Sequence, residues 1–458
     1  MSLVAGVDSS TQSVKVLVCH AQTGEVRREA SAPHPSGTEV DPEAWWQALE
    51  QVCGGGLLDD VAAIAVAAQQ HGMVCLGEDD RVVRPALLWN DTRSAPQATA
   101  LVDELGGPKA WAEAVGSVPT SSFTVTKLRW LAENEPDRAG RVRQVLLPHD
   151  WLTHRLGASP AVTDRGDASG TGYWSPASGS YRRDLATAAL GHEVDLPRVA
   201  EPSETVGSTP DGAALAAGTG DNMGAALAFG LSPGDVVVSL GTSGTVFAVS
   251  DHPTADPAGA VAGFADAEGR FLPLVCTLNA ARVLDSTASL LGGDHERLSR
   301  LALDSSPGAG GLVLLPYFDG ERTPDLPDAT GTLAGLTTDS LTPANLARAA
   351  VEAVLCGLAD GLDGLRKQGV RPTRLILIGG AARSEAVRTA ATSVFDVPVH
   401  VPRPAEYVAL GAARQAAWLL AGDPEPPDWH ADVGEAHDPA PAPHVRDRYA
   451  ELREALHP

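Results

Sequence analysis

Two copies of one strand–turn–strand pattern constrain the fold of this chain most strongly. In the first copy, apolar runs at residues 3–7 and 14–18 flank a turn of small hydroxyl residues. In the second copy, apolar runs at residues 235–240 and 244–247 flank a Gly-Thr-Ser turn. The copies lie about half a chain apart, as a duplicated domain would place them. Because 458 residues also exceed what one hydrophobic core usually organises, we expect two similar α/β domains. Their expected ranges are 1–231 and 232–458.

The first turn carries charges of both signs. Asp8 stands at its start and Lys15 at its exit. The outward-pointing N–H groups and hydroxyls of such a turn suit phosphate oxygens. An acid that holds a cation and a lysine that meets negative charge are both parts of a phosphoryl-transfer site. The alternative is an ordinary polar hairpin, which is the commoner explanation of this stretch taken alone.

The composition excludes several classes of partner. The formal net charge of -24 argues against nucleic acid and against an anionic membrane surface. The five cysteines are scattered, without the paired spacing of a zinc site or a disulfide framework. No apolar run approaches the roughly 20 residues that span a bilayer, and no segment resembles a signal peptide. We therefore expect a globular, cytoplasmic protein that binds neither nucleic acid nor membrane.

Polar side chains follow two of the apolar runs in the first half of the chain. Gln70 and His71 come directly after the run at 61–68, and both offer directional hydrogen bonds to a polyhydroxylated ligand. Trp89 ends a second run and could pack on the carbon face of a sugar. The alternatives are a core histidine and a core tryptophan. Residues 163–174 are rich in Asp, Gly, Ser and Thr, which predicts a loop bordering a cleft rather than part of the core.

Asp221 is the candidate general base. It follows a Gly-Thr-Gly turn at the start of a predicted helix, where N–H groups and the helix dipole would favour its ionised form. Asn222 is placed to hydrogen-bond the same substrate. The alternative is a helix-capping Asp without chemistry. The glycine turn at 379–380 precedes another predicted helix, where a nucleotide could approach the backbone closely. Together with Asp8, this turn favours the catalytic interpretation of Asp221.

Taken in order, these segments resemble the FGGY carbohydrate kinases, and among them most closely the xylulokinases. The resemblance runs from Gly6 to about Ala416 and is specific as an ordered set of motifs. The motifs are the Asp8 hairpin, Gln-Gln-His-Gly at 69–72, Leu-Trp-Asn-Asp at 88–91, Gly-Asp-Asn at 220–222, Ser-Leu-Gly-Thr-Ser-Gly at 239–244, Gly-Glu-Arg-Thr-Pro at 320–324 and Ile-Gly-Gly-Ala-Ala-Arg-Ser at 378–384.

The resemblance implies a pair of actin-like or ribonuclease-H-like domains with a central cleft, where ATP and Mg²⁺ meet a sugar. It implies phosphorylation of D-xylulose to D-xylulose 5-phosphate. Asp221 matches the family's base, and Asp8 matches its magnesium-organising acid, so both are expected at the metal. The matching sugar contacts are Gln70, His71, Trp89, Asp221 and Asn222. The matching ATP contacts are Thr11, Gln12, Lys15, Gly241, Thr242, Gly380, Ala381 and Ser384.

Some features depart from the family's patterns and leave alternatives open. Position 70 is Gln where Met is frequent in xylulokinases, so a kinase for another ketose or pentitol is an alternative. Many relatives carry Gly where this chain has Ser10 or Ser13. A non-catalytic, nucleotide-dependent switch of the actin-like superfamily is the alternative from a different class. A base such as Asp221 argues against it. Assembly into a homodimer is also left open.

Overall fold

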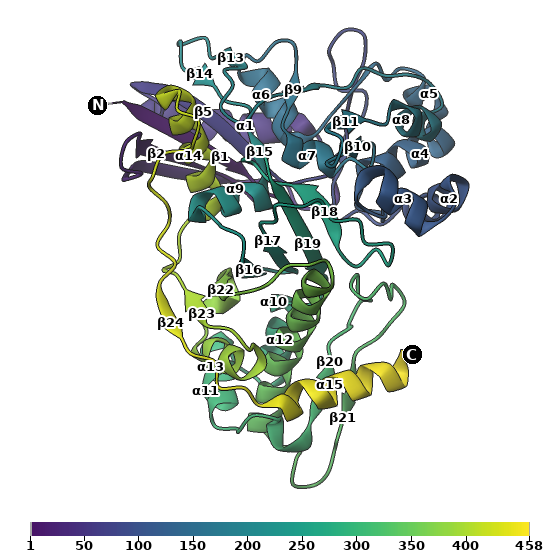
Figure 1. The fold of residues 1–458 in the computed structure, drawn as a ribbon, viewed down its shortest axis with the longest axis vertical. Coiled ribbons are helices and arrows are strands. Elements are labelled where there is room, and N and C mark those ends of the chain that lie inside the picture. The colour runs from purple at the N-terminus through teal and green to yellow at the C-terminus, as the bar shows by residue number, and fades with distance from the viewer. Residues whose placement is uncertain (1, 458) are drawn as a thin grey trace. The chain divides into compact units, whose positions relative to one another are not determined.

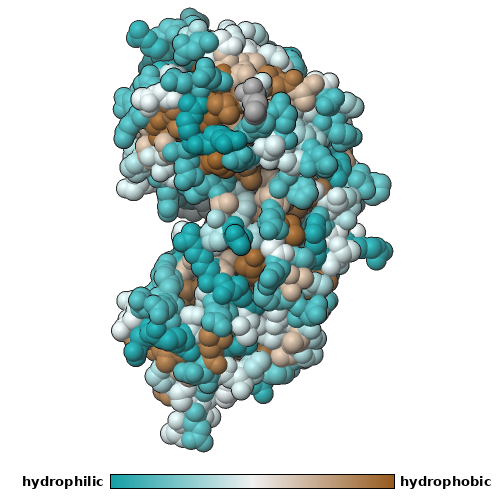
Figure 2. All heavy atoms as spheres, turned by 90° about the vertical axis from the view of Figure 1, so that its left-hand side faces the viewer, coloured by the Kyte–Doolittle hydropathy of each residue, from teal (hydrophilic) through white to brown (hydrophobic). Residues whose placement is uncertain are grey.

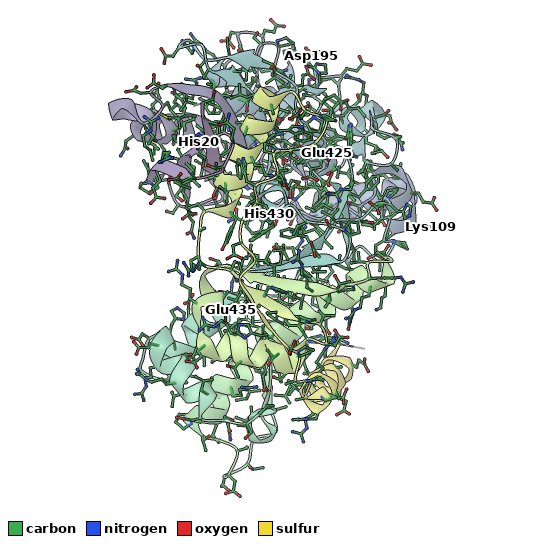
Figure 3. All side chains as sticks on the ribbon, turned by 60° about the vertical axis from the view of Figure 1, so that its left-hand side comes forward. His20, Lys109, Asp195, Glu425, His430 and Glu435 are labelled. Atoms are coloured by element: carbon green, nitrogen blue, oxygen red, sulfur yellow. The ribbon has the colours of Figure 1, made fainter. Side chains whose placement is uncertain are left out.

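The computed structural model describes residues 2–457, which divide into two compact units (Figure 1). Unit 1 comprises residues up to Leu231, Ser250–Leu272 and Glu406–Ala431. Unit 2 comprises Ser232–Val249, Pro273–Ala405 and residues from Asp432 onward. In Figure 3, Glu425 and His430 lie in the last segment of unit 1, and Glu435 lies in unit 2. The two continuous domains expected at 1–231 and 232–458 stay a prediction. The compact units follow a different division of the chain, since each is assembled from three segments.

The main sheet of unit 1 is built around β1. β1 pairs antiparallel with β2, which pairs antiparallel with β3. On its other edge β1 pairs in parallel with β5, and β5 pairs in parallel with β14 and with β15. The strands of this sheet are β1 (Leu3–Ser9), β2 (Ser13–His20), β3 (Val26–Pro33), β5 (Val61–Ala68), β13 (Gly207–Ser208), β14 (Ala214–Leu215) and β15 (Thr219–Gly220).

Unit 2 repeats this order of pairing in its own sheet. β16 pairs antiparallel with β17 and in parallel with β22, while β17 pairs antiparallel with β19 and β22 pairs in parallel with β23. This shared order confirms the internal repeat that the two hairpins predict. The strands that unit 2 contributes to this sheet are β16 (Asp235–Leu240), β17 (Gly244–Ala248), β19 (Phe271–Thr277), β22 (Arg374–Ile378), β23 (Val399–Val401) and β24 (Glu435–His437).

Helices cover both faces of the unit 1 sheet, because successive residues of a strand point to opposite faces. Ala5 and Val7 of β1 pack with Trp45 of α1, whereas Val4 packs with Ala409 and its neighbours in α14. Figure 1 shows α14, from late in the chain, beside β1 and α9. The helices of unit 1 are α1 (Pro42–Cys53), α2 (Ala95–Leu105), α3 (Pro108–Val115), α4 (Thr124–Asn134), α5 (Pro136–Ala139), α6 (Pro148–Leu156), α7 (Arg165–Ser169), α8 (Arg183–Leu190), α9 (Asp221–Phe229) and α14 (Tyr407–Ala421).

The remaining elements are five helices of unit 2 and several short strands. The helices are α10 (Ala281–Leu290), α11 (His295–Leu303), α12 (Pro343–Lys367), α13 (Glu385–Val394) and α15 (Pro443–Leu456). The short strands are β4 (Glu39–Val40), β6 (Val74–Leu76), β7 (Ala86–Leu87), β8 (Gln144–Leu146), β9 (Val162–Thr163), β10 (Trp174–Ser175), β11 (Ser180–Tyr181), β12 (Arg198–Val199), β18 (Ala262–Ala265), β20 (Val313–Leu315) and β21 (Thr332–Ala334).

The two hairpins form where the sequence predicts them, and the apolar run at 61–68 is the strand β5. The prediction for residues 163–174 is wrong. This segment contains the end of β9, all of α7 and the start of β10, and all of its residues except Arg165 are buried. Its polar side chains bond one another and the backbone, so a polar composition does not keep it out of the core.

On the face drawn in Figure 2, hydrophilic residues cover most of the surface and hydrophobic residues form small, separate patches. Among residues 2–457, no helix has both the length and the apolar character needed to cross a membrane.

Candidate active site

The carboxyl ends of three neighbouring parallel strands bring the predicted groups of unit 1 together. Ser9, at the end of β1, and Gly220, at the end of β15, both stand opposite Ala68, at the end of β5. Asp8 therefore lies at one side of this edge and Asp221 at the other, with Gln69 and its neighbours following β5 between them. Ligands of α/β proteins commonly bind at such an edge.

The first hairpin holds Asp8 in a hydrogen-bonded, buried position. Asp8 is only 3% exposed and accepts a hydrogen bond of 2.5 Å from the hydroxyl of Ser10. Burial raises the pKa of Asp8 to about 6, against the opposing effects of this hydrogen bond and of the Lys15 charge. Ser10 thus serves as a hydrogen-bond donor to the acid.

Lys15 stands opposite Asp8 in the β1–β2 pair, but its ammonium group is bound elsewhere. Its Nζ lies 2.5 Å from Oε2 of Glu406, the residue just before α14, and both side chains are partly exposed. A phosphate at this turn would compete with Glu406 for the lysine. The sequence offered no signal for this ion pair, because 391 positions separate its members.

Thr11 links the phosphate turn to Trp89. The indole N–H of Trp89 donates a hydrogen bond of 2.9 Å to the Thr11 hydroxyl, and that hydroxyl lies 3.4 Å from Oε1 of Gln69. Trp89 is therefore neither a wholly buried core residue nor isolated from the turn. Gln12, at the tip of the turn, is exposed.

His71 has a strained backbone and a fixed ring. Its φ of 67° lies in the left-handed region, which non-glycine residues enter rarely and often at functional sites. Its Nδ1 lies 2.6 Å from the carbonyl oxygen of Gly170, so Nδ1 carries the proton that this bond needs. The ring packs against Phe123 and Phe264, with centroids 4.8 and 5.7 Å away. Thr124 also donates to the His71 carbonyl, at 2.9 Å.

Gln70 is buried beside the turn that carries Asp221. Its side chain is 5% exposed, and its Nε2 has no hydrogen-bond partner within residues 2–457. A Cβ atom at Gly220 would lie 2.9 Å from Cγ of Gln70, so only glycine permits this contact. A buried amide without a partner is costly unless a ligand satisfies it.

Asp221 is the first residue of α9, and Gly220 is the N-cap. Oδ1 of Asp221 accepts hydrogen bonds from the backbone N–H and from Nδ2 of Asn222, at 2.8 and 2.9 Å. The sequence predicts a stabilised ionised form, and this is wrong. Burial, followed by the charge of Asp8, raises the pKa of Asp221 to about 7 and outweighs the N–H donors. Such a pKa suits a general base near neutral pH.

A second group of acids, which sequence reasoning missed, lies behind this turn. Thr219 donates a hydrogen bond of 2.9 Å to Oδ2 of Asp164, and Asp164 also caps α7 by accepting from the N–H groups of Gly166 and Asp167. Asp167 in turn lies 2.5 Å from Nδ1 of His149. The spacing Asp-x-x-Asp at 164–167 is a helix-start signal that could have located this group.

His149, Asp150 and Asp167 are the residues within 2–457 that cluster as three candidate metal ligands. Two ligands of one zinc ion, each at about 2.0–2.2 Å in tetrahedral geometry, stand more than 3 Å apart. The 2.5 Å separation of His149 Nδ1 and Asp167 Oδ2 is therefore that of a charged hydrogen bond. The carboxylates of Asp8 and Asp221, whose charges interact within unit 1, are oxygen donors of the kind that a hard cation such as Mg²⁺ prefers.

The predicted nucleotide residues lie on two turns of unit 2. Gly241 and Thr242 form the exposed turn between β16 and β17, and the Gly241 carbonyl accepts from the N–H of Ala281 at 3.0 Å. Gly379 follows β22 with φ of 95°, and a Cβ there would lie 2.4 Å from the Leu240 carbonyl oxygen. This contact holds the glycine turn at 379–380 against the end of β16.

Four further residues of the predicted motifs in unit 2 have clear positions. A Cβ at Gly380 would meet no atom within 4 Å, and Ala381 follows it in a single 3-10 turn. The Ser384 hydroxyl caps α13 by accepting from the N–H of Val387 at 3.4 Å. Glu321 of the Gly-Glu-Arg-Thr-Pro motif is buried and accepts from the N–H of Leu278 at 2.6 Å. This motif therefore ties two loops of unit 2 together.

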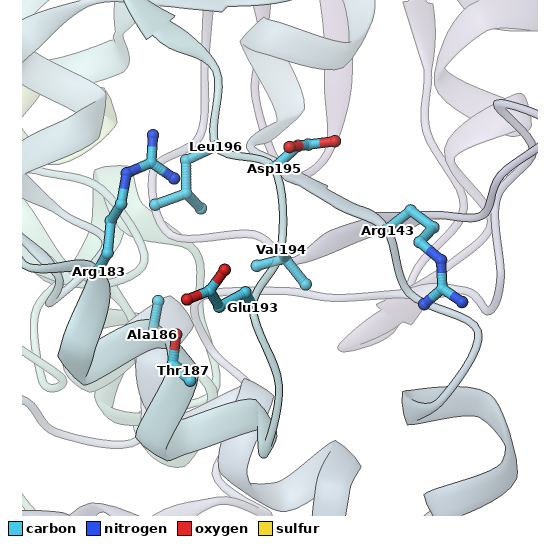
Figure 4. A pocket seen from close by; sticks show the side chains of 8 residues that line it. All are labelled: Arg143, Arg183, Ala186, Thr187, Glu193, Val194, Asp195 and Leu196. Carbon is cyan, nitrogen blue, oxygen red and sulfur yellow. The ribbon is translucent and has the colours of Figure 1, made fainter.

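A separate cavity in unit 1, of about 330 Å³, contains none of the predicted site residues (Figure 4). Arg143, Arg183 and Glu193 are among its charged lining residues. Arg143 is already paired with Glu78 at 3.0 Å. The strand-end site, rather than this cavity, gathers the titratable groups with raised pKa values that mark functional sites.

Known proteins match both halves of the chain. Residues 3–231 match the FGGY family of carbohydrate kinases, N-terminal domain, and residues 236–420 match the C-terminal domain of that family. The chain is 49% identical over 436 residues to a xylulose kinase of Streptomyces coelicolor and 48% identical over 441 residues to one of Streptomyces rubiginosus. Each alignment covers 92% of this chain and 89% of the relative.

Solved structures agree with these matches. The xylulose kinase from Bifidobacterium adolescentis is 46% identical, with a TM-score of 0.89 and 99% of each chain covered. A xylulose kinase from Brucella ovis is 29% identical, with a TM-score of 0.91 and the same coverage. These findings confirm the predicted fold class of two actin-like, ribonuclease-H-like α/β domains. The chain belongs to the FGGY family of carbohydrate kinases.

Proposed function

We propose that this kinase transfers the terminal phosphoryl group of ATP to D-xylulose and forms D-xylulose 5-phosphate. The observation that carries the proposal is the meeting of Asp8, Gln70 and Asp221 at the carboxyl ends of adjacent strands in unit 1. The relatives named xylulose kinase, at 48–49% identity, favour this sugar over another ketose or a pentitol.

Asp221 acts as the general base in this proposal. A pKa of about 7 lets it accept a proton from the sugar hydroxyl while that oxygen attacks phosphorus. The bonds from the Asn222 backbone and amide hold the carboxylate in one orientation, with Oδ1 occupied. Oδ2 is then the oxygen that receives the proton. A switch that only binds nucleotide would have no use for such a group.

The sugar is held by the polar residues around this base. The unpartnered Nε2 of Gln70 can donate to a sugar oxygen, which would satisfy an amide that is otherwise buried without a bond. His71 presents its ring to the sugar, oriented by Gly170 and by the two phenylalanine rings. Trp89 and Asn222 complete the proposed sugar contacts.

The phosphates of ATP are assigned to the two turns and the adenosine side to residues 380–384. Thr11, Gln12 and Lys15 are proposed for the first turn, and Gly241 and Thr242 for the second. Mg²⁺ would be held by Asp8 and Asp221, and when bound it neutralises charge on the transferring phosphoryl group. The five cysteines of the described residues are free thiols, which supports the proposed cytoplasmic location.

The test measures ADP release with a panel of ketopentoses, aldoses and pentitols, for the native chain and for Asp221→Asn. D-xylulose should give the highest kcat/KM, and the variant should lose about 10²–10⁴ in kcat, the usual contribution of a general base. Asp211→Asn, at an exposed loop position, is the matched control and should keep native turnover. Near-native kcat in Asp221→Asn would overturn the base assignment, and best turnover on another sugar would overturn the substrate.

A further inference from the structure

A fully buried ion pair lies directly under the turn that carries Asp221. His149, near the start of α6, and Asp167, in α7, are both 0% exposed. Their Nδ1 and Oδ2 atoms are 2.5 Å apart. Removing one member of a buried pair is strongly destabilising, yet replacing both members by apolar residues is often neutral. The presence of this buried ion pair therefore does not by itself show that its role is to stabilise the fold.

The turn at residues 217–220 packs on this pair with no space between them. A Cβ at Gly218 would lie 2.6 Å from Cδ2 of His149, and a Cβ at Gly220 would lie 2.8 Å from Oδ1 of Asp167. Real Cβ atoms do not approach other atoms so closely, so glycine is needed at both positions. The two side chains thus set the position of the backbone that ends at Asp221.

The imidazole ring also binds the start of the same turn. Its Nε2 lies 3.3 Å from the carbonyl oxygen of Ala217. Burial disfavours the charged ring, but the attraction of Asp150 and Asp167 outweighs it and raises the pKa of His149 to about 10. The ring is then protonated at neutral pH, and both nitrogens can donate, one to Asp167 and the other to Ala217.

Helix α7 connects this support to the second sugar residue. Its N-cap, Asp164, binds the Thr219 hydroxyl of the turn, and its C-cap, Gly170, accepts the hydrogen bond from His71. One short, buried helix therefore contacts both Asp221's turn and His71. Oδ1 of Asp167, which has no hydrogen-bond partner within residues 2–457, lies on the side of α7 that meets the turn.

We propose that His149 and Asp167 are positioning residues, which hold the turn at residues 217–220 and thereby place Asp221 for proton abstraction. This inference rests on the proposed function of Asp221 as the base. Neither residue is assigned a contact with sugar, nucleotide or metal.

Asp167→Asn tests the proposal with little change of shape. The amide oxygen can still accept from His149, but the variant removes the negative charge that attracts the protonated ring beneath the turn. We expect kcat to fall by about 10- to 100-fold, because a displacement near 1 Å can cost about 10² in rate. KM for ATP should change by less than about threefold, since the proposed nucleotide turns of unit 2 are untouched.

Two further variants separate positioning from stability. Gly220→Ala disturbs the same contact from the side of the turn, together with the contact between Gly220 and Gln70. It leaves both charges in place and should lower kcat similarly. Glu352→Gln breaks the buried Arg348–Glu352 pair of unit 2, whose atoms are 2.6 Å apart, and should lower the thermal midpoint without changing kcat. Native kcat in both Asp167→Asn and Gly220→Ala would overturn the proposal, even if the midpoint falls.

Failure of the positioning proposal can be told apart from failure of the proposed function. If Asp221→Asn keeps native turnover, the base assignment fails and the positioning proposal fails with it. If Asp221→Asn is inactive while Asp167→Asn and Gly220→Ala turn over normally, only the positioning proposal fails.

Discussion

At the scale of single residues, the site is defined by carboxylates whose environments move their pKa values upward. The pKa values of Asp8 and Asp221 are both raised, chiefly by burial, and the charge of Asp8 raises the pKa of Asp221 further. Two neighbouring, partly buried carboxylates repel each other, and such pairs commonly bind a cation or take up a proton at functional sites. The helix-start argument for Asp221 failed because it weighed the donors and not the burial.

The raised pKa of Asp221 predicts an acid limb in the rate. Below about pH 7 the folded enzyme carries a protonated Asp221, so kcat/KM for the sugar should fall about tenfold for each further pH unit. Above this pH the carboxylate is ionised and the profile should level. The measurement is kcat/KM between pH 5 and 9 at two Mg²⁺ concentrations, with coupling enzymes in excess at each pH. A flat profile from pH 5 to 8 would contradict the assignment of Asp221.

At the scale of elements, local patterns predict the hairpins well because each is specified within about 15 residues. Runs of β-branched apolar residues on either side of a turn of small hydroxyl residues are enough to predict the β1–β2 and β16–β17 hairpins. The helices α2 and α3 were not predicted. α2 buries only Ala98 and Leu101, so its apolar face gives a weak periodic signal. The support under Asp221 was missed for another reason, since no local pattern tells which acid will meet His149.

Close contact between α14 and its neighbours gives the clearest element-scale prediction. A Cβ at Gly411 would lie 1.8 Å from the carbonyl oxygen of Gly224 in α9. Gly411→Ala should therefore lower stability by about 2–3 kcal/mol, as overpacking does. Gly357, inside α12, is the matched control, because its Cβ would come no closer than 3.6 Å to the Tyr449 hydroxyl. Gly357→Ala should raise stability by up to about 1 kcal/mol through its helix propensity.

Thermal unfolding of the two variants checks this pair of expectations. The midpoint should move down for Gly411→Ala and stay level or move up for Gly357→Ala. Equal shifts in both variants would show that glycine's general effect on helices, rather than the contact of α14 with α9, decides the outcome.

At the scale of the whole molecule, the residues proposed to bind the sugar and those proposed to bind adenosine lie in different copies of the repeated sheet domain. The proposed sugar residues all belong to unit 1, whereas Gly241, Thr242 and residues 380–384 belong to unit 2. The repeat could be predicted because both hairpins use the same turn chemistry. The discontinuous course of the chain could not, because the return of α14 to unit 1 depends on small residues that also suit any buried helix.

This division predicts that the Michaelis constants for sugar and for ATP can be changed separately. Gly380 is exposed and has open space around its missing Cβ, so Gly380→Leu should fold normally but obstruct a nucleotide at this turn. We expect KM for ATP to rise about tenfold, equal to about 1.4 kcal/mol of binding, with little change in KM for D-xylulose. Gln70→Ala should do the reverse, because it removes a donor proposed for the sugar and leaves unit 2 intact. Kinetic titration of both substrates measures the four constants. If Gly380→Leu raised only the sugar constant, or Gln70→Ala only the ATP constant, the assignment of ligands to units would be wrong.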